Sequence, residues 1–247
     1  MKRDWVSWVV LWAVLTALGE AAFFMFSPLP IPGSEEAEVF NWIFSILTVL
    51  GIVVLMFVLS FLIVAAVKFR VPDDGNLDDD LEDGPYIPDN RHIVHRWEQV
   101  TIALTLFLII VTGFLGLSRF NGEQSGEMAI AVQGQQWSWV ITHENGGVAT
   151  DELVVPVNTR IRYDVSATDV LHSFWVPAFA AKVDAVPGRP TVIYVTAIEE
   201  ADGATNVLYR LQCAELCGLG HAAMAINVRV VPRAEYQAYI ASLEGGS

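Results

Sequence analysis

The chain has 247 residues, of which 53% are hydrophobic, and 28 acidic against 14 basic side chains give it a formal net charge of −14. A mean hydropathy of +0.45 indicates a chain that is partly embedded in a lipid bilayer. We expect no nucleic-acid partner for it.

Three apolar segments are long enough to cross a bilayer about 30 Å thick at a helical rise of 1.5 Å per residue. They lie within residues 1–26, 39–67 and 99–118. Apolar runs of this length argue against the alternative of buried core helices. The first segment begins with Met1-Lys2-Arg3 and contains Ala17-Leu18-Gly19, so it is either a first transmembrane helix or a cleavable signal-like segment.

The positions of Lys and Arg predict the orientation of these spans. The basic residues near the spans are Lys2, Arg3, Lys68, Arg70, Arg91 and Arg96, and the loop at residues 27–38 has none. Because cytoplasmic loops carry the excess of Lys and Arg, the loop 27–38 is external and the segment 68–98 is cytoplasmic. This cytoplasmic loop is acidic and turn-rich, and we assign it no function. We therefore expect a multi-pass protein of the bacterial plasma membrane, whose C-terminal domain is periplasmic or extracellular.

Residues 119–232 have the pattern of an all-β domain. Short alternating runs are separated by Gly, Pro, Asn and Asp clusters. The predicted strands are Met128 to Gln133, Trp137 to Thr142, Arg160 to Ser166, Thr191 to Ala197, Val207 to Gln212 and Ile226 to Val231. A Greek-key sandwich of about a hundred residues fits this pattern. The tail 233–247 has apolar residues at helical spacing and predicts a short terminal helix.

One short run near the C-terminus carries the most distinctive chemistry. It reads C-A-E-L-C-G-L-G-H-A-A-M and contains the only two cysteines of the chain, Cys213 and Cys217, together with His221 and Met224. His172 stands upstream in L-H-S-F-W. Thiolate, thioether and imidazole ligands favour copper, and a weak Met ligand is typical of electron-transfer copper sites. Two thiolates exceed what a mononuclear site uses, so the pair could bridge two metals.

Three other interpretations compete with copper. An even number of cysteines outside the cytoplasm could form a disulfide, the Cys and His residues could hold zinc, and the Met could be core packing. A disulfide explains neither His221 nor Met224. Zinc explains neither Glu215 nor the glycine-rich turn at Gly218 and Gly220. The copper interpretation uses every distinctive residue.

The run from Gln212 to Met224 resembles the dicopper (CuA) signature of cytochrome c oxidase subunit II. The segments 169–177 (D-V-L-H-S-F-W-V-P), 134–139 (G-Q-Q-W-S-W) and 182–189 (K-V-D-A-V-P-G-R) resemble that family's first-ligand strand, aromatic segment and K-x-D-A-x-P-G-R loop. The resemblance covers roughly residues 128 to 232. It narrows the β domain to a cupredoxin-like Greek-key β-barrel. With the apolar segments, we therefore expect a membrane-anchored all-β protein, with N-terminal transmembrane helices followed by this barrel.

The resemblance also implies a ligand set. Both cysteines would bridge two copper ions of a CuA centre, which His172, Cys213, Glu215, Cys217, His221 and Met224 would bind. The backbone carbonyl of Glu215 would be the ligand, which leaves its side chain for a Mg or Mn ion at the interface with the catalytic subunit.

Trp137 matches the family's exposed aromatic residue through which electrons enter. Its neighbour Ser138 departs from the family, which has an aromatic residue there. Asp169 is our candidate acid for docking the donor, with Asp151 and Glu152 as further candidates. Residues 118–247 carry fourteen acidic and eight basic side chains, which suits the electrostatic attraction of a basic donor such as cytochrome c.

The histidines limit what this chain does alone. None of the five, His92, His95, His143, His172 and His221, lies in a proposed span, so an oxygen-reducing haem–copper site must be on another chain. We therefore predict an electron-accepting subunit of a proton-translocating cytochrome c oxidase, with catalytic subunit I and other oxidase subunits as partners. The alternatives are the CuA subunit of a nitric oxide reductase and a non-enzymatic copper-binding assembly protein. A quinol oxidase subunit is rejected, because those typically lack the copper ligands.

Overall fold

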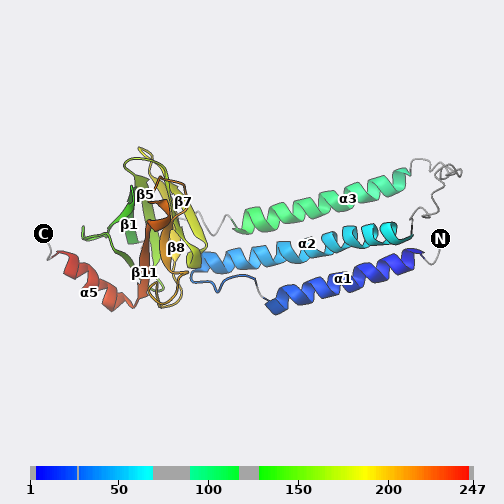
Figure 1. Ribbon diagram of the computed structural model, residues 1–247, viewed down its shortest axis with the longest axis horizontal. Coiled ribbons are helices and arrows are strands. Elements are labelled where there is room, and N and C mark those ends of the chain that lie inside the picture. Colours follow the sequence, from blue (N-terminus) through cyan, green and yellow to red (C-terminus); the bar gives the residue numbers. More distant parts are fainter. Residues whose placement is uncertain (1–3, 27, 69–89, 117–127, 245–247) are drawn as a thin grey trace. The chain divides into compact units, whose positions relative to one another are not determined.

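The computed structural model describes residues 4–26, 28–68, 90–116 and 128–244. The chain divides into two compact units, one formed by residues 1–28 and 44–113 and the other by residues 29–43 and 114–247. The first unit contains the long helices except for the start of the second one, and the second unit contains that start, the β domain and the C-terminal helix (Figure 1). The expected loop at 69–89, the segment 117–127 and the ends of the chain lie outside the described residues.

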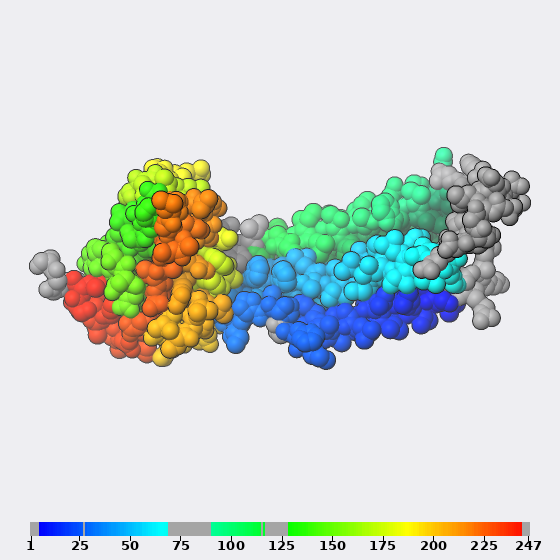
Figure 2. Space-filling view, viewed as in Figure 1, coloured from blue at the N-terminus to red at the C-terminus, as the bar shows by residue number. Residues whose placement is uncertain are grey.

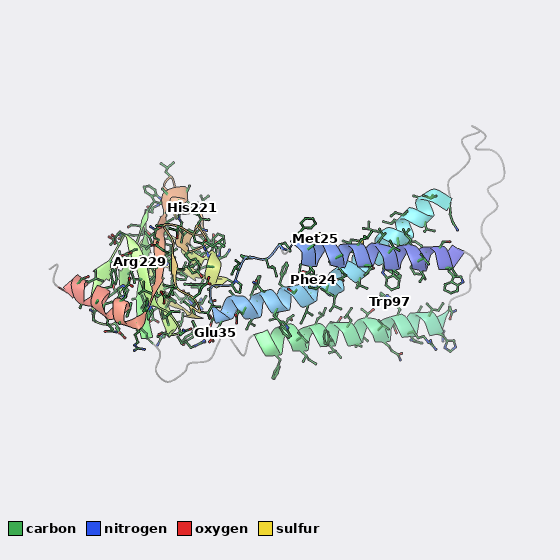
Figure 3. The ribbon with its side chains drawn as sticks, turned by 90° about the horizontal axis from the view of Figure 1, so that it is seen from below. Phe24, Met25, Glu35, Trp97, His221 and Arg229 are labelled. Atoms are coloured by element: carbon green, nitrogen blue, oxygen red, sulfur yellow. The ribbon has the colours of Figure 1, made fainter. Side chains whose placement is uncertain are left out.

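Among the described residues, three helices are long and apolar enough, by length and composition, to cross a membrane. They are α1 (Asp4–Phe26), α2 (Glu35–Lys68) and α3 (Arg91–Leu108), which continues as the π-helical η1 (Ile109–Gly116). Apolar side chains of α1 such as Phe24 and Met25 project outward, 67% and 75% exposed, as expected for residues that face lipid (Figure 3).

Two helices begin earlier than the hydropathy indicated. The helix α2 begins at Glu35 rather than at residue 39, and three acidic residues in its first turn are favoured by the helix dipole. The helix α3 begins at Arg91 rather than at residue 99, because the side chain of Asn90 caps it by accepting a hydrogen bond from the Ile93 amide at 3.4 Å. Hydropathy identifies only the apolar part of such a helix, and polar first turns escape it.

The first sheet of the β domain has the strand order β3-β2-β1-β5-β8. Its strands are β1 (Met128–Gln135), β2 (Ser138–Thr142), β3 (Val148–Ala149), β5 (Arg160–Ala167) and β8 (Thr191–Thr196). Strands β1 and β5 are parallel and the other neighbours are antiparallel. Burial alternates along β1 and β5, so one face of each strand lies in the core and the other faces outward.

The second sheet has the order β4-β11-β10-β6-β7, with β9 paired to β11. Its strands are β4 (Glu152–Pro156), β6 (His172–Val176), β7 (Ala181–Ala185), β9 (Ala201–Asp202), β10 (Arg210–Cys213) and β11 (Ala225–Val231). The neighbours β10 and β6 place Cys213 opposite Phe174. This register brings the end of β10 beside the start of β6, where His172 stands.

Both sheets contribute to one hydrophobic core, and Tyr163 of β5 contacts Phe174 of β6 with their ring centroids 5.1 Å apart. The predicted fold class, a membrane-anchored chain with a cupredoxin-like β domain, is confirmed. The strand predicted from Trp137 is wrong at its first residue, because Gln136 and Trp137 form the turn between β1 and β2. Of the predicted strand 207–212, only the end is extended, since β10 begins at Arg210. Strand β4 was not predicted.

The expected external loop 27–38 is partly built into the β domain. Ser34 bridges to Ala197, and its hydroxyl donates a hydrogen bond to the Phe179 carbonyl at 2.9 Å. Two residues later, Glu36 forms a buried ion pair with Arg160 at 3.1 Å. The first turns of α2 therefore belong to the β domain, in which they are anchored by polar contacts.

The chain ends with α5 (Arg233–Glu244), at the residues where the tail predicts a helix. The Asn145 amide donates a hydrogen bond to the Ile240 carbonyl at 2.9 Å, and the buried His143 ring lies 3.1 Å from the Tyr236 hydroxyl. The red helix consequently lies against the green residues that follow β2 (Figure 2). It closes this side of the β domain.

Candidate metal centre

The distinctive C-terminal run forms a loop between two neighbouring strands. Cys213 is the last residue of β10, and Met224 immediately precedes β11. Between them, Gly218 adopts a φ of +119°, a conformation that L side chains rarely adopt, and His221 opens a single 3-10 turn (η3, His221–Ala223). His172 arrives from β6, the neighbour of β10. Two strand ends and one tight loop thus deliver all the candidate ligands to one place.

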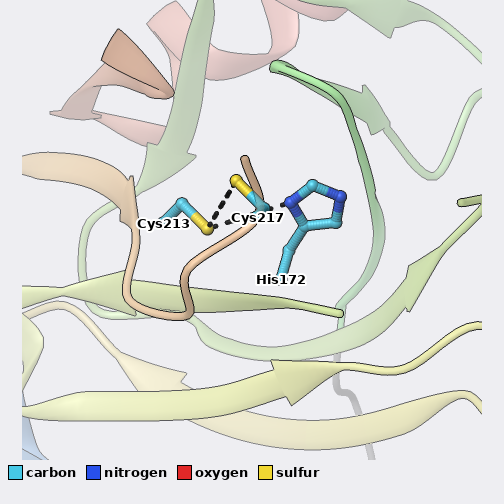
Figure 4. A group of neighbouring side chains, drawn as sticks. All are labelled: His172, Cys213 and Cys217. Atoms are coloured by element: carbon cyan, nitrogen blue, oxygen red, sulfur yellow. Dashed lines mark hydrogen bonds between the residues drawn. The ribbon is translucent and has the colours of Figure 1, made fainter. Parts of the chain in front are cut away.

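The sulfur and nitrogen atoms of these residues converge. The Sγ atoms of Cys213 and Cys217 lie 3.7 Å apart. Each has its own imidazole, because His172 Nδ1 lies 3.8 Å from the Cys213 sulfur and His221 Nδ1 lies 3.6 Å from the Cys217 sulfur. His172, Cys213 and Cys217 have ligand atoms within 4.8 Å of one another, a grouping that could hold a metal ion (Figure 4).

Two further donors complete the set. The Met224 Sδ lies 3.8 Å from the Cys217 sulfur, and the Glu215 carbonyl oxygen lies 3.1 Å from the Cys213 sulfur. The structure therefore brings together all six residues that the sequence nominated. Sulfur with imidazole suits copper better than a hard ion, and both cysteines are free thiols in this structure rather than a disulfide.

The centre is buried on the sulfur side. Cys213, Cys217 and Met224 are 8%, 3% and 1% exposed, and His172 is fully buried. Burial, followed by the hydrogen bond and the charge of Cys213, raises the pKa of the Cys217 thiol to about 11. Two thiolates this close repel each other, so a bound cation is what would allow both to be ionised.

Asp169 holds the His172 ring in place. Its carboxylate lies 2.8 Å from His172 Nε2 and accepts hydrogen bonds from the Gln136 amide at 2.7 Å and the Val170 amide at 2.6 Å. Although desolvation acts to raise the pKa of Asp169, these hydrogen bonds together lower it below its ordinary value. By engaging Nε2, the carboxylate leaves Nδ1 directed to the Cys213 sulfur, as carboxylates do behind metal-bound histidines. Both carboxylate oxygens are therefore engaged within the chain.

Trp137 lies directly over the ligand loop and is 41% exposed. Its Nε1 donates a hydrogen bond to the Cys217 carbonyl at 3.3 Å, and Gln136 Nε2 donates to the same oxygen at 2.7 Å. Its ring covers Gly220, where an added Cβ atom would collide with the indole. Only glycine fits under this ring, so the indole is in direct contact with the loop.

The other candidate acids stand apart from the ligand set. Asp151 is exposed, while Glu152 lies opposite Asn227 on the neighbouring strand and pairs with Arg229 at 3.3 Å. The Glu215 side chain is exposed. No contact in the described residues tests the docking or Mg/Mn roles of these acids, so those roles stay predictions.

Sequence reasoning missed the supporting residues of the site. Gln136 and Gly220 hold the indole on the loop, and Gly134 leaves room for His172, because a Cβ there would lie 3.0 Å from the ring. The signal for Gly134 and Gln136 was their place in the G-Q-Q-W-S-W segment, whereas nothing local indicated that Gly220 lies under Trp137.

Comparison with known proteins shows the family of the chain. The family model for the cytochrome c oxidase subunit II periplasmic domain matches residues 146–231. Cytochrome c oxidase subunit 2 of Brettanomyces custersianus is 32% identical over 182 residues, which cover 63% of this chain and 71% of that protein. The chain belongs to the cytochrome c oxidase subunit 2 family. The subunit 2 of Alkalihalophilus pseudofirmus is 30% identical over 206 residues, 81% of this chain and 56% of that protein.

Other relatives in the subunit 2 family are matched over a shorter part of their length. The chain spans 30% of the subunit 2 of Thermostichus vulcanus and 44% of that of Bacillus sp. PS3. Among solved structures, the periplasmic domain of subunit II of the Bradyrhizobium japonicum oxidase aligns with a TM-score of 0.45 at 30% identity, covering 49% of this chain and 96% of that domain. The family model is that of a periplasmic domain, so the β domain lies on the periplasmic side of the bacterial plasma membrane, as the Lys and Arg residues predicted.

Proposed function

We propose that this chain is the electron-accepting subunit of a haem–copper terminal oxidase. It receives electrons from cytochrome c or a similar soluble donor at a dinuclear copper (CuA) centre and delivers them to haem in catalytic subunit I, which reduces oxygen. The observation that carries the proposal is the pair of thiols 3.7 Å apart, each with its own imidazole Nδ1 within 3.8 Å.

The donor atoms of the chain fit two copper ions. Cys213 and Cys217 would be shared between them, His172 and His221 would each complete one side, and Met224 and the Glu215 carbonyl would be the weaker ligands. When bound, the copper pair supplies one-electron redox chemistry.

The protein's part is to keep these donors still. Cys213 and His172 are fixed by the β10–β6 register, and Asp169 fixes the orientation of the His172 ring. Because the ligands are placed by strands and one tight loop, little needs to move when an electron arrives or leaves. Trp137 covers the loop from the exposed side and is the residue through which we expect electrons to enter.

Two alternatives remain testable. A copper-binding assembly protein would present accessible ligands, whereas the two cysteines here are at most 8% exposed. The CuA subunit of a nitric oxide reductase would differ only in its partner, and the names of the relatives favour the oxidase. The Glu215 side chain, exposed beside the ligand loop, is our candidate for a Mg or Mn ion at the interface with the catalytic subunit.

Metal analysis of the purified full-length chain tests the copper centre. We expect two copper ions per chain and a mixed-valence spectrum in which one unpaired electron is shared by both metals. The Cys213→Ser variant should lose that spectrum, whereas Ser173→Ala, on the adjacent strand, should keep it. One copper per chain, zinc, or a Cys213–Cys217 disulfide in the active preparation would exclude the dinuclear centre. The haems and large subunit that co-purify then separate oxygen from nitric oxide chemistry.

A further inference from the structure

The turn between β1 and β2 reaches the candidate ligands from the opposite sheet. The ligands themselves come from β6 and from the loop after β10, which belong to the second sheet, whereas Gln136 follows β1 of the first sheet. The end of β1 is tied to the segment before β6, because the Thr168 amide donates a hydrogen bond to the Gly134 carbonyl at 3.1 Å. The first sheet therefore contributes to the site through this one turn.

Gln136 is hydrogen-bonded to both halves of the ligand set. Its backbone amide donates to the Asp169 carboxylate at 2.7 Å, and that carboxylate lies 2.8 Å from the His172 ring. Its side-chain Nε2 donates to the Cys217 carbonyl, also at 2.7 Å. One residue thus links a histidine on a strand to a cysteine in the ligand loop.

The ligand loop leaves room for the Gln136 side chain. A Cβ added to Gly218, the residue after Cys217, would lie 3.0 Å from Gln136 Nε2, so the missing side chain is what lets the amide approach. The Cys217 carbonyl also accepts the Trp137 indole N–H at 3.3 Å, and a carbonyl oxygen has lone pairs for both donors. Because 2.7 Å lies within the usual range for N–H···O hydrogen bonds and 3.3 Å lies beyond it, Gln136 makes the stronger of the two contacts.

The two contacts of Gln136 differ in how they respond to substitution. Every residue except proline has a backbone N–H, so the contact with Asp169 survives replacement of the side chain. The contact with Cys217 depends on the side-chain amide, which leucine lacks. Gln136→Leu should therefore release the Cys217 peptide and leave His172 held by Asp169.

We propose that Gln136 is a positioning residue for the copper centre. Its side-chain amide holds the Cys217 peptide, and with it the sulfur ligand, while its backbone amide steadies His172 through Asp169. This role rests on the proposed function, because the orientation of Cys217 matters as a ligand orientation only where copper binds. Gln136 acts through these two residues and is not itself a ligand.

Carbonyl NMR of the metal-free, full-length chain in detergent tests the contact with Cys217. The chain has only two cysteines, so cysteine labelled with ¹³C at the carbonyl gives two resonances, which Cys217→Ser assigns. Gln136→Leu should shift the Cys217 resonance, because this carbonyl loses a hydrogen bond. Gln135→Leu is the matched control and should shift neither resonance, since Gln135 is also exposed but donates to the Ser138 hydroxyl at 3.1 Å. An unchanged Cys217 resonance in Gln136→Leu would overturn the proposal.

Copper binding tests the consequence for the site. In chelator competition, Gln136→Leu should lower copper affinity about 2- to 10-fold, the value of one net hydrogen bond, and Gln135→Leu should keep wild-type affinity. The loaded Gln136→Leu chain should show altered hyperfine couplings of the Cys217 β-protons and unaltered couplings of the His172 ring. Wild-type affinity and couplings in Gln136→Leu, or changes equal to those of Gln135→Leu, would refute the role.

The two measurements also separate this role from the proposed function. A wild-type chain that binds no copper pair would refute the proposed function, whereas the carbonyl resonance of the metal-free chain still decides whether Gln136 holds Cys217. A wild-type chain with the copper pair, and a Gln136→Leu chain that matches it in every reading, would refute the positioning role alone.

Discussion

The buried ion pair between Glu36 and Arg160 gives a direct test of whether the first turns of α2 are structural parts of the β domain. The two side chains are 3% and 13% exposed and lie 3.1 Å apart, and the second Glu36 oxygen accepts the Thr196 amide at 3.0 Å. In Glu36→Gln the amide oxygen can still accept from Thr196, so the charge is what is lost. Breaking a buried pair from one side costs about 3–5 kcal/mol, because the remaining charge stays buried.

We therefore expect Glu36→Gln and Arg160→Met each to lower the free energy of unfolding of the β domain by about 3 kcal/mol. The assay is urea unfolding of the full-length chain in detergent, followed by near-ultraviolet circular dichroism. The double variant removes both charges, so it should cost less than the sum of the two single changes, by a coupling energy of about 1–3 kcal/mol.

Arg162 is the matched control on the same strand. It pairs with Asp164 at 2.9 Å, but the two side chains are 40% and 36% exposed. Exposed pairs contribute about 0–1 kcal/mol, so Arg162→Met should have a small effect. The reasoning is refuted if Arg160→Met costs no more than Arg162→Met, or if the Glu36 and Arg160 changes are additive.

Three further predictions concern the loop and α5. Trp137→Ala should slow electron input from the donor in stopped-flow measurements while copper content stays at wild-type level. Gly220→Ala, whose Cβ would collide with the indole, should do the same. Loss of copper instead would show that the indole is structural. Asp169→Asn should weaken copper binding at His172 about 10–100-fold, measured by chelator competition, and unchanged affinity would contradict its positioning role. Burial lowers the pKa of His143 from 6.5 to about 4, so the unfolded chain binds the His143 proton at higher pH than the folded chain does. The free energy of unfolding should therefore be full above about pH 6.5 and fall by at most about 3 kcal/mol towards pH 4. His143→Gln should flatten this dependence on pH in urea titrations.

The predictable part of the fold is the part in which each strand has one buried and one exposed face. Strands β1 and β5 show this alternation in the sequence itself. Strand β4 is buried at four successive positions, and β6 is buried on both sides, so neither shows a period of two. Such strands are recognisable only as short apolar runs, or by resemblance in the case of β6.

The convergence of the proposed ligands was predictable because their chemistry is unusual and most of them are local in the sequence. Cys213, Cys217, His221 and Met224 stand within twelve residues, and only His172 comes from elsewhere. Asp169 was predicted from the sequence to be an acid that docks the donor, and in the structure its two carboxylate oxygens are engaged by the His172 ring and two amides. We now expect it to position the ligand, and docking by Asp151, Glu152 or Asp169 remains to be measured. Sequence spacing does not reveal the contact between Asp169 and the Gln136 amide, because the two residues are 33 positions apart in the chain.

The contacts of Ser34 and Glu36 also bear on the order in which the protein is made. Their partners Phe179, Arg160 and Thr196 are 145, 124 and 160 residues further along the chain. During translation this early segment, which includes the first turn of α2, is synthesised before the rest of α2 and before α3, and its partners are on strands that emerge much later. The contacts that fix this segment in the β domain can therefore form only after β5, β8 and Phe179 have been synthesised. A chain that ends before these strands would leave Ser34 and Glu36 without the three partners.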